Sequence, residues 1–235
     1  MINWNKYFDH IFILSRCSNF ERRENLNKEL KRIGLYDYVT YLYQPDSELL
    51  NYNSSKLSKK AFRCKYAHYS CIKMSYELGY DNICILEDDM IFLKSIDEIE
   101  KQLEIFLENK INSNIYLFDY IQNNAYKYND QYFLADFYWL DKHGMKYLIY
   151  LLETCPNIMN DSIFLPYLNN FVEYSTYMIL SKEIIDYINI KKENNILPIN
   201  INISPKRICV QSQILNENNQ YLVYKNEIDI SLYNI

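Results

Sequence analysis

The sequence predicts an α/β protein whose largely parallel central sheet is flanked by helices. Short apolar runs of strand length alternate with longer segments in which apolar residues recur at helical spacing, and this alternation fills the first half of the 235-residue chain. The short runs are apolar at nearly every position, as expected of strands that are covered on both faces. With 49% hydrophobic residues, the chain is able to bury a substantial core as one domain spanning residues 1–235.

The first strand is predicted at Ile11 to Leu14, a run of four apolar residues. Ser18 and Glu21 follow it with the S-x-x-E spacing of a capping box, so a helix is expected to begin there. Gly34 stands where a C-terminal helix glycine is common. The apolar stripe of this helix consists of Leu26, Leu30 and Ile33.

The same alternation continues along the chain. The predicted elements are a strand at 38–43, a helix at 58–78, a strand at 82–86, a helix at 96–108 and a strand at 114–118. Gly79 is expected to end the helix at 58–78, and Ser95 with Glu98 repeats the capping-box spacing before residue 96. This β-α-β-α-β-α-β order is typical of a parallel sheet.

The second half is less regular, and residues 123–170 are predicted to contain an insertion. Weaker patterns indicate a helix at 142–152, a strand at 174–180 followed by a helix capped at Ser181, a loop at 191–202 and a short strand at 207–211.

Charge and cysteine usage narrow the function classes. The formal net charge of -5 argues against a general nucleic-acid binder, which normally carries a strongly basic face. No apolar stretch is long enough for a signal peptide or a membrane span, so a cytoplasmic protein is expected, working beside a membrane through a partner. The cysteines form no C-x-x-C pair and are predicted to be reduced: Cys17, Cys64, Cys71, Cys84, Cys155 and Cys209.

Three consecutive acids, Glu87, Asp88 and Asp89, come directly after the apolar strand at 82–86. Ligands of parallel sheets collect at the carboxyl ends of the strands, where Ser15 is also expected. If the chain stays extended, Glu87 and Asp89 point to the same side and can hold Mg²⁺ or Mn²⁺, which prefer oxygen ligands. The competing interpretation is a solvated acidic turn that caps the next helix.

Three segments resemble glycosyltransferase family 25, which includes bacterial lipopolysaccharide galactosyltransferases and collagen galactosyltransferases. They are residues 11–23, with an opening strand and an arginine-containing helix start; residues 64–71, similar to the family's G-C-x-x-S-H helix; and residues 79–89, similar to its strand ending in E-D-D. Later on, residues 174–182 resemble the family's strand-to-helix segment, for which residues 138–144 are a competing match.

This resemblance implies a GT-A-like fold and transfer of a hexose, galactose foremost, from a UDP-sugar to a glycan or glycoconjugate, with inversion. Residues 1–120 would form the half that binds donor and metal, and residues 121–235 the acceptor side. The metal, Mn²⁺ or Mg²⁺, would be held by Asp89 with Glu87. The residues implied to line the donor site are Ser15, Arg22, Arg23, His68, Glu87 and Asp88.

An inverting transfer needs a carboxylate base beside the acceptor hydroxyl, and Asp161 and Glu173 are the candidates. The chain also departs from the family pattern: Ser15-Arg16 replaces Asn-Leu and Ala67 replaces Ser. The position at which the family usually has an acidic residue falls near Asn200, which is not acidic. Two alternatives therefore stay open: an inactive glycosyltransferase-like binding module, and another divalent-metal phosphotransferase or hydrolase.

Overall fold

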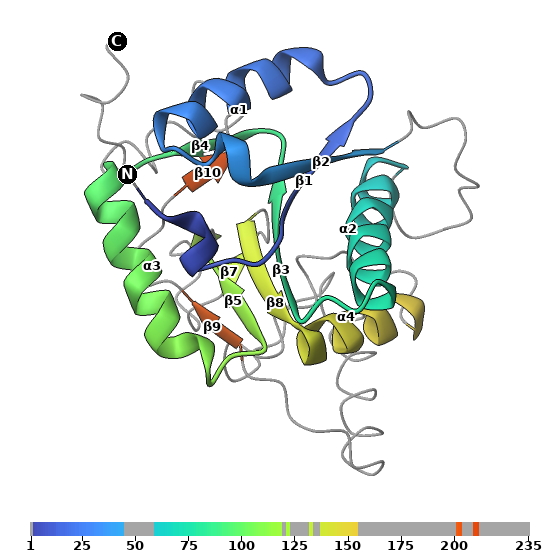
Figure 1. Ribbon diagram of the computed structural model, residues 1–235. Coiled ribbons are helices and arrows are strands. Elements are labelled where there is room, and N and C mark those ends of the chain that lie inside the picture. Colours follow the sequence, from blue (N-terminus) through green and yellow to red (C-terminus); the bar gives the residue numbers. More distant parts are fainter. Residues whose placement is uncertain are drawn as a thin grey trace.

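The computed structural model describes residues 2–44, 59–118, 121–122, 132–133, 137–154, 201–203 and 209–211. Within these ranges a six-stranded sheet has the order β2-β1-β3-β8-β5-β9 (Figure 1). Its strands are β1 (Ile11–Arg16), β2 (Val39–Gln44), β3 (Asn82–Glu87), β5 (Ile115–Leu117), β8 (Phe137–Asp141) and β9 (Ile201–Ile203). Two small sheets pair β4 (Met90–Phe92) with β10 (Cys209–Gln211) and β6 (Ile121–Gln122) with β7 (Tyr132–Phe133).

The main sheet is largely parallel. Strand β1 pairs in parallel with both β2 and β3, and β5 pairs in parallel with β9. Strand β8 is antiparallel to both of its neighbours, β3 and β5. All strands of this sheet other than β8 therefore run in one direction, and the predicted α/β class with a largely parallel sheet is confirmed.

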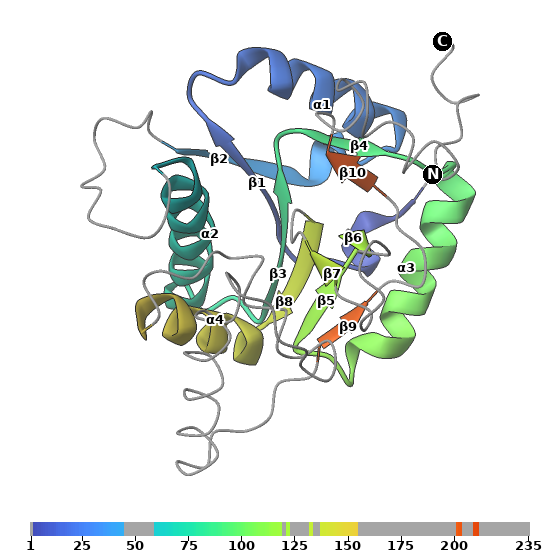
Figure 2. The same cartoon turned by 180° about the vertical axis from the view of Figure 1, so that it is seen from behind.

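Helices cover both faces of the sheet (Figures 1 and 2). They are α1 (Phe20–Arg32), α2 (Lys59–Glu77), α3 (Ile96–Lys110) and α4 (Lys142–Thr154), with 3₁₀ turns η1 (Trp4–Lys6) and η2 (Tyr36–Tyr38). Alternate strand residues face opposite layers. Phe12 and Ile83 pack in one core with residues of α2 and α4. Ile13 and Leu86 pack in the other with residues of α1 and α3.

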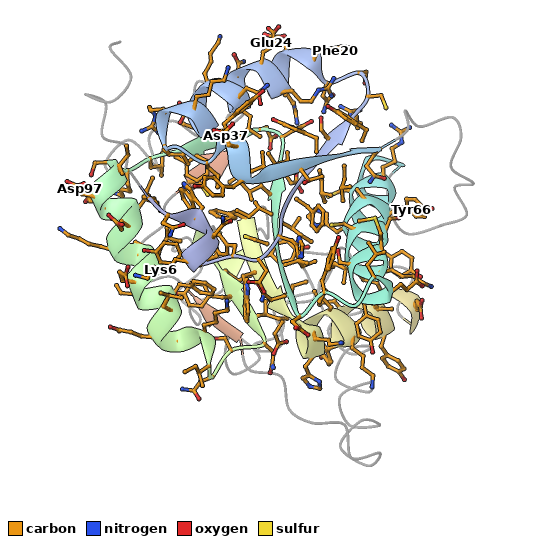
Figure 3. The ribbon with its side chains drawn as sticks, in the orientation of Figure 1. Lys6, Phe20, Glu24, Asp37, Tyr66 and Asp97 are labelled. Atoms are coloured by element: carbon orange, nitrogen blue, oxygen red, sulfur yellow. The ribbon has the colours of Figure 1, made fainter. Side chains whose placement is uncertain are left out.

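The turn η1 and the residues after it pack against the core that lies between the sheet and helices α1 and α3. Trp4 and Phe8 are buried there, and Phe8 stacks edge-on against Phe118 with 5.6 Å between ring centroids. Lys6 forms an ion pair with Glu104 of α3, beside the Lys6 label in Figure 3. The apolar residues among positions 2–8 thus belong to this core.

Helix boundaries test the capping predictions. Gly34 and Gly79 both adopt positive φ, 70° and 82°, which confirms that they end their helices. The side chain of Ser95 accepts a hydrogen bond from the Glu98 N–H, as its capping box predicts. The first helix, however, begins at Phe20 rather than at Ser18, with Asn19 as the N-cap residue. Asn19 uses its side chain elsewhere, as described below.

The second half differs from prediction in two places. Helix α4 confirms the helix predicted at 142–152. Strand β8, which was not among the predicted strands, lies within residues 123–170 and is hydrogen-bonded between β3 and β5. Residues 201–203 form β9 against β5, although the loop predicted at 191–202 overlaps them. The structure confirms a strand at 209–211. The elements predicted at 174–180 and after Ser181 lie outside the described residues, and the division into two halves stays a prediction.

The described cysteines form no disulfide bond, as predicted, and Cys155 lies outside the described residues. Burial raises the pKa of the Cys71 thiol to about 12 and that of Cys84 well above its usual value, so both pack as small apolar groups. In the described part of the chain, no helix has both the length and the apolar character to cross a bilayer.

Gly144, one of only three glycines in the chain, lies where α4 passes β5. A Cβ atom there would meet the backbone carbonyl of Asn114 well inside van der Waals distance, with the carbonyl carbon 3.1 Å away. We expect Gly144→Ala to lower the free energy of unfolding by about 1–3 kcal/mol, as overpacking does. Urea denaturation measures this. Lys146→Ala, on the exposed side of the same helix, is the control and should change it by less than about 0.5 kcal/mol.

Candidate functional site

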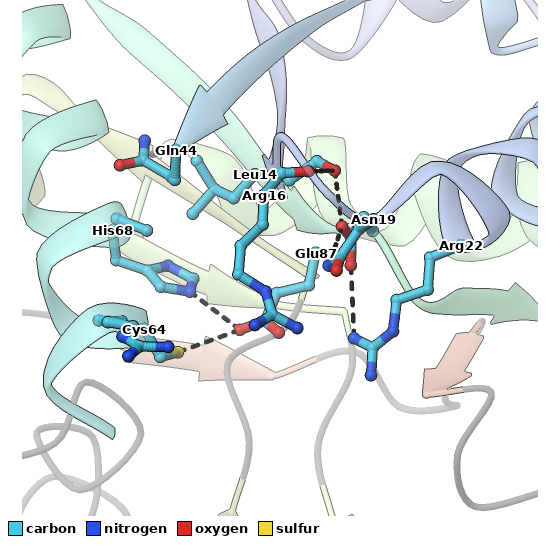
Figure 4. A pocket seen from close by; sticks show the side chains of 12 residues that line it. Leu14, Arg16, Asn19, Arg22, Gln44, Cys64, His68 and Glu87 are labelled. Carbon is cyan, nitrogen blue, oxygen red and sulfur yellow. Dashed lines mark hydrogen bonds and ion pairs between the residues drawn. The ribbon is translucent and has the colours of Figure 1, made fainter. Parts of the chain in front are cut away.

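A pocket opens where the carboxyl ends of β1, β2 and β3 lie side by side (Figure 4). Its volume is about 130 Å³. One water needs roughly 10–15 Å³ on this measure, so the pocket can admit a group of several atoms. The parallel strand order brings these ends together, as expected for ligand sites of α/β sheets. The lining residues are Leu14, Ser15, Arg16, Asn19, Arg22, Gln44, Arg63, Cys64, Ala67, His68, Glu87 and Asp88.

Most of the predicted site residues are brought together here: Ser15, Arg22, His68, Glu87 and Asp88 line the pocket. Asp89 and Arg23 are not among the lining residues, although each contacts a residue that is. Asp161 and Glu173 lie outside the described residues, so their roles as candidate bases stay predictions. The roles assigned to all of these residues likewise stay predictions.

The acidic triplet does not continue as an extended strand. Residues 88–89 form a turn between β3 and β4, so Glu87 and Asp89 have different surroundings. Asp88 and Asp89 are buried, with side chains 6% and 1% exposed. The two acids therefore do not form a solvated acidic turn, which was the competing interpretation.

Asp88 and Asp89 are hydrogen-bonded by side chains from the end of β1 and from the start of α1. Ser15 Oγ donates to Asp88 Oδ2 at 2.6 Å, and Asn19 Nδ2 donates to the same oxygen at 2.8 Å. Arg22 Nη1 lies 2.9 Å from Asp89 Oδ2 and 3.4 Å from Asp88 Oδ1. One guanidinium therefore balances two carboxylates, and these bonds tie the first turn of α1 to the end of β3.

Arg23 contacts the loop between β1 and α1, whereas its neighbour Arg22 contacts Asp88 and Asp89. Its guanidinium donates to Ser15 Oγ at 2.9 Å and to the Cys17 carbonyl at 2.9 Å, and also to the Arg16 carbonyl. These bonds hold the loop between β1 and α1 and fix the hydroxyl that serves Asp88. The predicted contact of Arg23 with a donor stays a prediction.

Glu87, the first acid, is engaged from helix α2. His68 Nε2 lies 3.0 Å from Glu87 Oε1, and the Cys64 thiol donates to the same oxygen at 3.5 Å (Figure 4). His68 is 2% exposed, and its Nδ1 lies 2.7 Å from the Tyr138 hydroxyl. Burial by itself would raise the pKa of Glu87. The hydrogen bond and charge of His68, helped by Cys64 and Arg22, outweigh burial and lower it. Glu87 is therefore ionised at neutral pH.

Two further cations line the pocket. Arg16 is exposed at its mouth. Arg63 has a buried Nε atom with no hydrogen-bond partner among the described residues. Buried donors are usually paired with an acceptor. Sequence analysis missed the place of Arg63 in the pocket lining and the contact between Cys64 and Glu87. The available signal was the i, i+4 spacing of Cys64 and His68, which places both side chains on one helix face.

Glu87 is the acid of the triplet that lies near other side chains able to hold a metal ion. The Glu87 carboxylate lines the pocket, is ionised, and has a thiol and an imidazole within reach. Asp89 is almost fully buried behind it, and its charge is already balanced by Arg22. Asp89 as a direct metal ligand stays a prediction, one that requires Arg22 to release its carboxylate.

No protein-family model and no curated protein sequence matches the chain significantly. Solved structures that are similar in shape include the following three. A glycosyltransferase involved in the glycosylation of the major capsid of PBCV-1 is 14% identical, over 68% of this chain and 78% of that one, with a TM-score of 0.39. GlyE of Streptococcus pneumoniae is 11% identical, over 95% and 61%, with a TM-score of 0.42. A Drosophila β-1,4-galactosyltransferase mutant with manganese, UDP-Gal and xylobiose is 9% identical, over 91% and 73%, with a TM-score of 0.37. These values assign no family to the chain.

The lowered pKa of Glu87 generates a pH-dependent prediction. A carboxylate whose pKa is lowered in the folded state stabilises the fold at pH values above its usual pKa of about 4.5. This stabilisation is lost as the pH falls through the folded-state pKa. We expect Glu87→Gln to lower the free energy of unfolding by about 1.5–3 kcal/mol at pH 7, the value of a hydrogen bond to a charged group. The difference should shrink below pH 4.5.

Urea denaturation of both proteins between pH 3.5 and 8 provides the measurement. Glu108→Gln, which removes an exposed carboxylate from α3, is the matched control and should stay within about 0.5 kcal/mol of the wild type. A Glu87→Gln effect that is constant or grows toward acid would contradict the stabilising role of the ionised group.

Proposed function

We propose that the chain is a glycosyltransferase that transfers a hexose, galactose foremost, from a UDP-sugar to a glycan or glycoconjugate acceptor. One observation carries the proposal: guanidinium groups and carboxylates converge in a single pocket at the carboxyl ends of three parallel strands. The resemblance of residues 11–23, 64–71 and 79–89 to family 25 supports the same reaction. The proposal keeps the cytoplasmic, membrane-peripheral location expected from the sequence.

The arginines of the pocket are suited to a diphosphate. Guanidinium groups bind phosphate oxygens through paired, charge-assisted hydrogen bonds. Arg63 has a buried donor in the pocket wall that awaits an acceptor, and Arg16 lies at the mouth. Arg22 is committed to Asp88 and Asp89, so it is the least available of the three. We therefore assign donor-phosphate binding first to Arg63 and Arg16.

Glu87 and Asp88 have different roles in this proposal: Glu87 would bind the cation, and Asp88 stabilises the fold. A bound divalent ion, Mn²⁺ or Mg²⁺, would neutralise charge on the leaving diphosphate. Glu87 is the carboxylate that this chain offers it inside the pocket. Asp88 orients Ser15 and Asn19 at the pocket wall, which keeps the β1–α1 loop in place.

Transfer with inversion forms a bond between the acceptor oxygen and the anomeric carbon while the bond to UDP breaks on the opposite side. The acceptor hydroxyl gives its proton to a carboxylate base, and Asp161 or Glu173 is proposed for this role. The proton and the leaving diphosphate therefore depart on different sides of the sugar.

A second candidate is a sugar-nucleotide binding module without transfer activity. The observation that favours it is the ion pairing of Arg22 with both Asp88 and Asp89, which occupies two of the three acids. Release of UDP from a UDP-hexose, with or without a glycan acceptor, separates the two candidates. The enzyme releases UDP, whereas the module only binds.

Nucleotide binding is tested by the melting temperature with UDP, alone and with Mn²⁺. A ligand that binds only the folded state stabilises it, by about 2.7 kcal/mol at a hundred times its Kd. We expect UDP with Mn²⁺ to raise the melting temperature of the wild type, and Arg63→Ala to lose most of that shift because the diphosphate loses a guanidinium. Lys28→Ala, which removes an exposed cation from α1, should keep it.

Two results would count against the proposal. One is a folded wild type whose melting temperature does not respond to UDP and Mn²⁺ at millimolar concentration. The other is a shift that Arg63→Ala retains in full, because the pocket would then not hold the phosphates.

A further inference from the structure

We propose that Cys64, His68 and Glu87 form a binding site for a transition-metal cation of the Zn²⁺ class. One ligand atom from each residue, a sulfur, an imidazole nitrogen and a carboxylate oxygen, lies within 4.8 Å of the other two. All three residues line the pocket. The inference goes beyond the proposed function, because such a site exists whether or not the pocket takes a nucleotide sugar.

The backbone supplies this arrangement without strain. Cys64 and His68 are four residues apart on α2, so they lie on one face of the helix, one turn from each other. The same i, i+4 spacing places paired metal-ligating histidines in helical zinc motifs. Glu87 ends β3, whose carboxyl end faces this part of α2. Two ligands from a helix and one from a strand end thus converge on one point.

The distances are close to those of a tetrahedral site. With metal–sulfur bonds of about 2.3 Å and metal–nitrogen or metal–oxygen bonds of about 2.0–2.1 Å, neighbouring ligand atoms are about 3.3–3.6 Å apart. Cys64 Sγ lies 3.5 Å from Glu87 Oε1, and His68 Nε2 lies 3.0 Å from the same oxygen. A metal ion would therefore need only small side-chain movements to replace the two hydrogen bonds.

The donor set selects the cation. Thiolate and imidazole favour borderline ions such as Zn²⁺ and Co²⁺, whereas Mg²⁺ prefers oxygen ligands alone. On binding, the Cys64 thiol gives its proton to the solvent, and the sulfur takes the metal as a thiolate. One thiolate and one carboxylate then balance the charge of the dication, which suits a mostly buried location.

Tyr138 provides the support that a metal-ligating histidine needs. His68 Nδ1 lies 2.7 Å from the Tyr138 hydroxyl, which can either donate or accept. When His68 Nε2 binds the metal, its Nδ1 carries the ring proton, and this N–H donates a hydrogen bond to the Tyr138 hydroxyl oxygen. Such outer partners fix the orientation of the ring and contribute about 10–100-fold to metal affinity. Tyr138 is fully buried on the central strand β8, so its hydroxyl is held in place.

The fourth position of this site faces the pocket. Only three protein ligands are supplied by the described residues, which is the composition of zinc sites that keep one position open. A water molecule or an oxygen of a bound ligand would complete the coordination there. The metal would thus be accessible to whatever enters the pocket.

The test replaces zinc with Co²⁺, because cobalt bound to a thiolate absorbs in the near ultraviolet by charge transfer. Metal-free protein, kept reduced with a phosphine, is titrated with Co²⁺ in the absence of nucleotide. We expect one equivalent to produce the thiolate band and Zn²⁺ to abolish it by displacement. Cys64→Ser should lose the band. Cys17→Ser, which removes an exposed thiol, should retain it.

Tyr138→Phe distinguishes a metal site from a merely structural cluster. It should keep the thiolate band, because the ligands remain, and weaken Co²⁺ binding by about 10–100-fold. Absence of the band in folded wild type, its persistence in Cys64→Ser, or its loss in Cys17→Ser overturns the proposal. A shift with UDP and no cobalt band would refute this site alone, and a cobalt band with no UDP shift would refute only the proposed function.

Discussion

The arrangement of the pocket depends on the burial of two adjacent carboxylates, Asp88 and Asp89, immediately after β3. Carboxylates that leave water need hydrogen bonds and opposite charge, or they would be protonated or expelled. Asn19 and Arg22 meet this need from the first turn of α1. The requirement fixes where α1 begins relative to β3. It also leaves Glu87 as the acid of the triplet that contacts α2.

Most of the first half could be predicted because its signals are local. The apolar runs at 11–14 and 82–86 became β1 and β3, and Gly34 ended α1 at positive φ. The place of β8 in the sheet could not be predicted, since apolar spacing reports which residues are buried and not which strand lies beside which. Strand β9 was missed for a related reason: three residues are too few for a period, and the partner β5 defines them.

The candidate site, like the fold, was predictable only in part. The rule that ligands collect at the carboxyl ends of parallel strands placed Ser15 and Glu87 at one pocket. His68 was assigned to the same site only through the resemblance of residues 64–71 to family 25. The contacts among them were not predictable. That Arg22, which lines the pocket, also pairs with Asp88 and Asp89 depends on the distance between α1 and β3, a tertiary quantity absent from any short motif.

The antiparallel strand β8 has a consequence for the order in which the sheet is assembled. Strands β1 to β3 and their helices are contiguous in the chain, so they can pair while synthesis continues. Strand β5 is the next strand of this sheet to be synthesised, but it has no place beside β3 until β8, residues 137–141, has emerged and entered between them. During that interval β3 presents an unpaired edge, the kind of surface on which nascent chains aggregate. The pocket, built on β1 to β3, can therefore form before the sheet that supports it is closed.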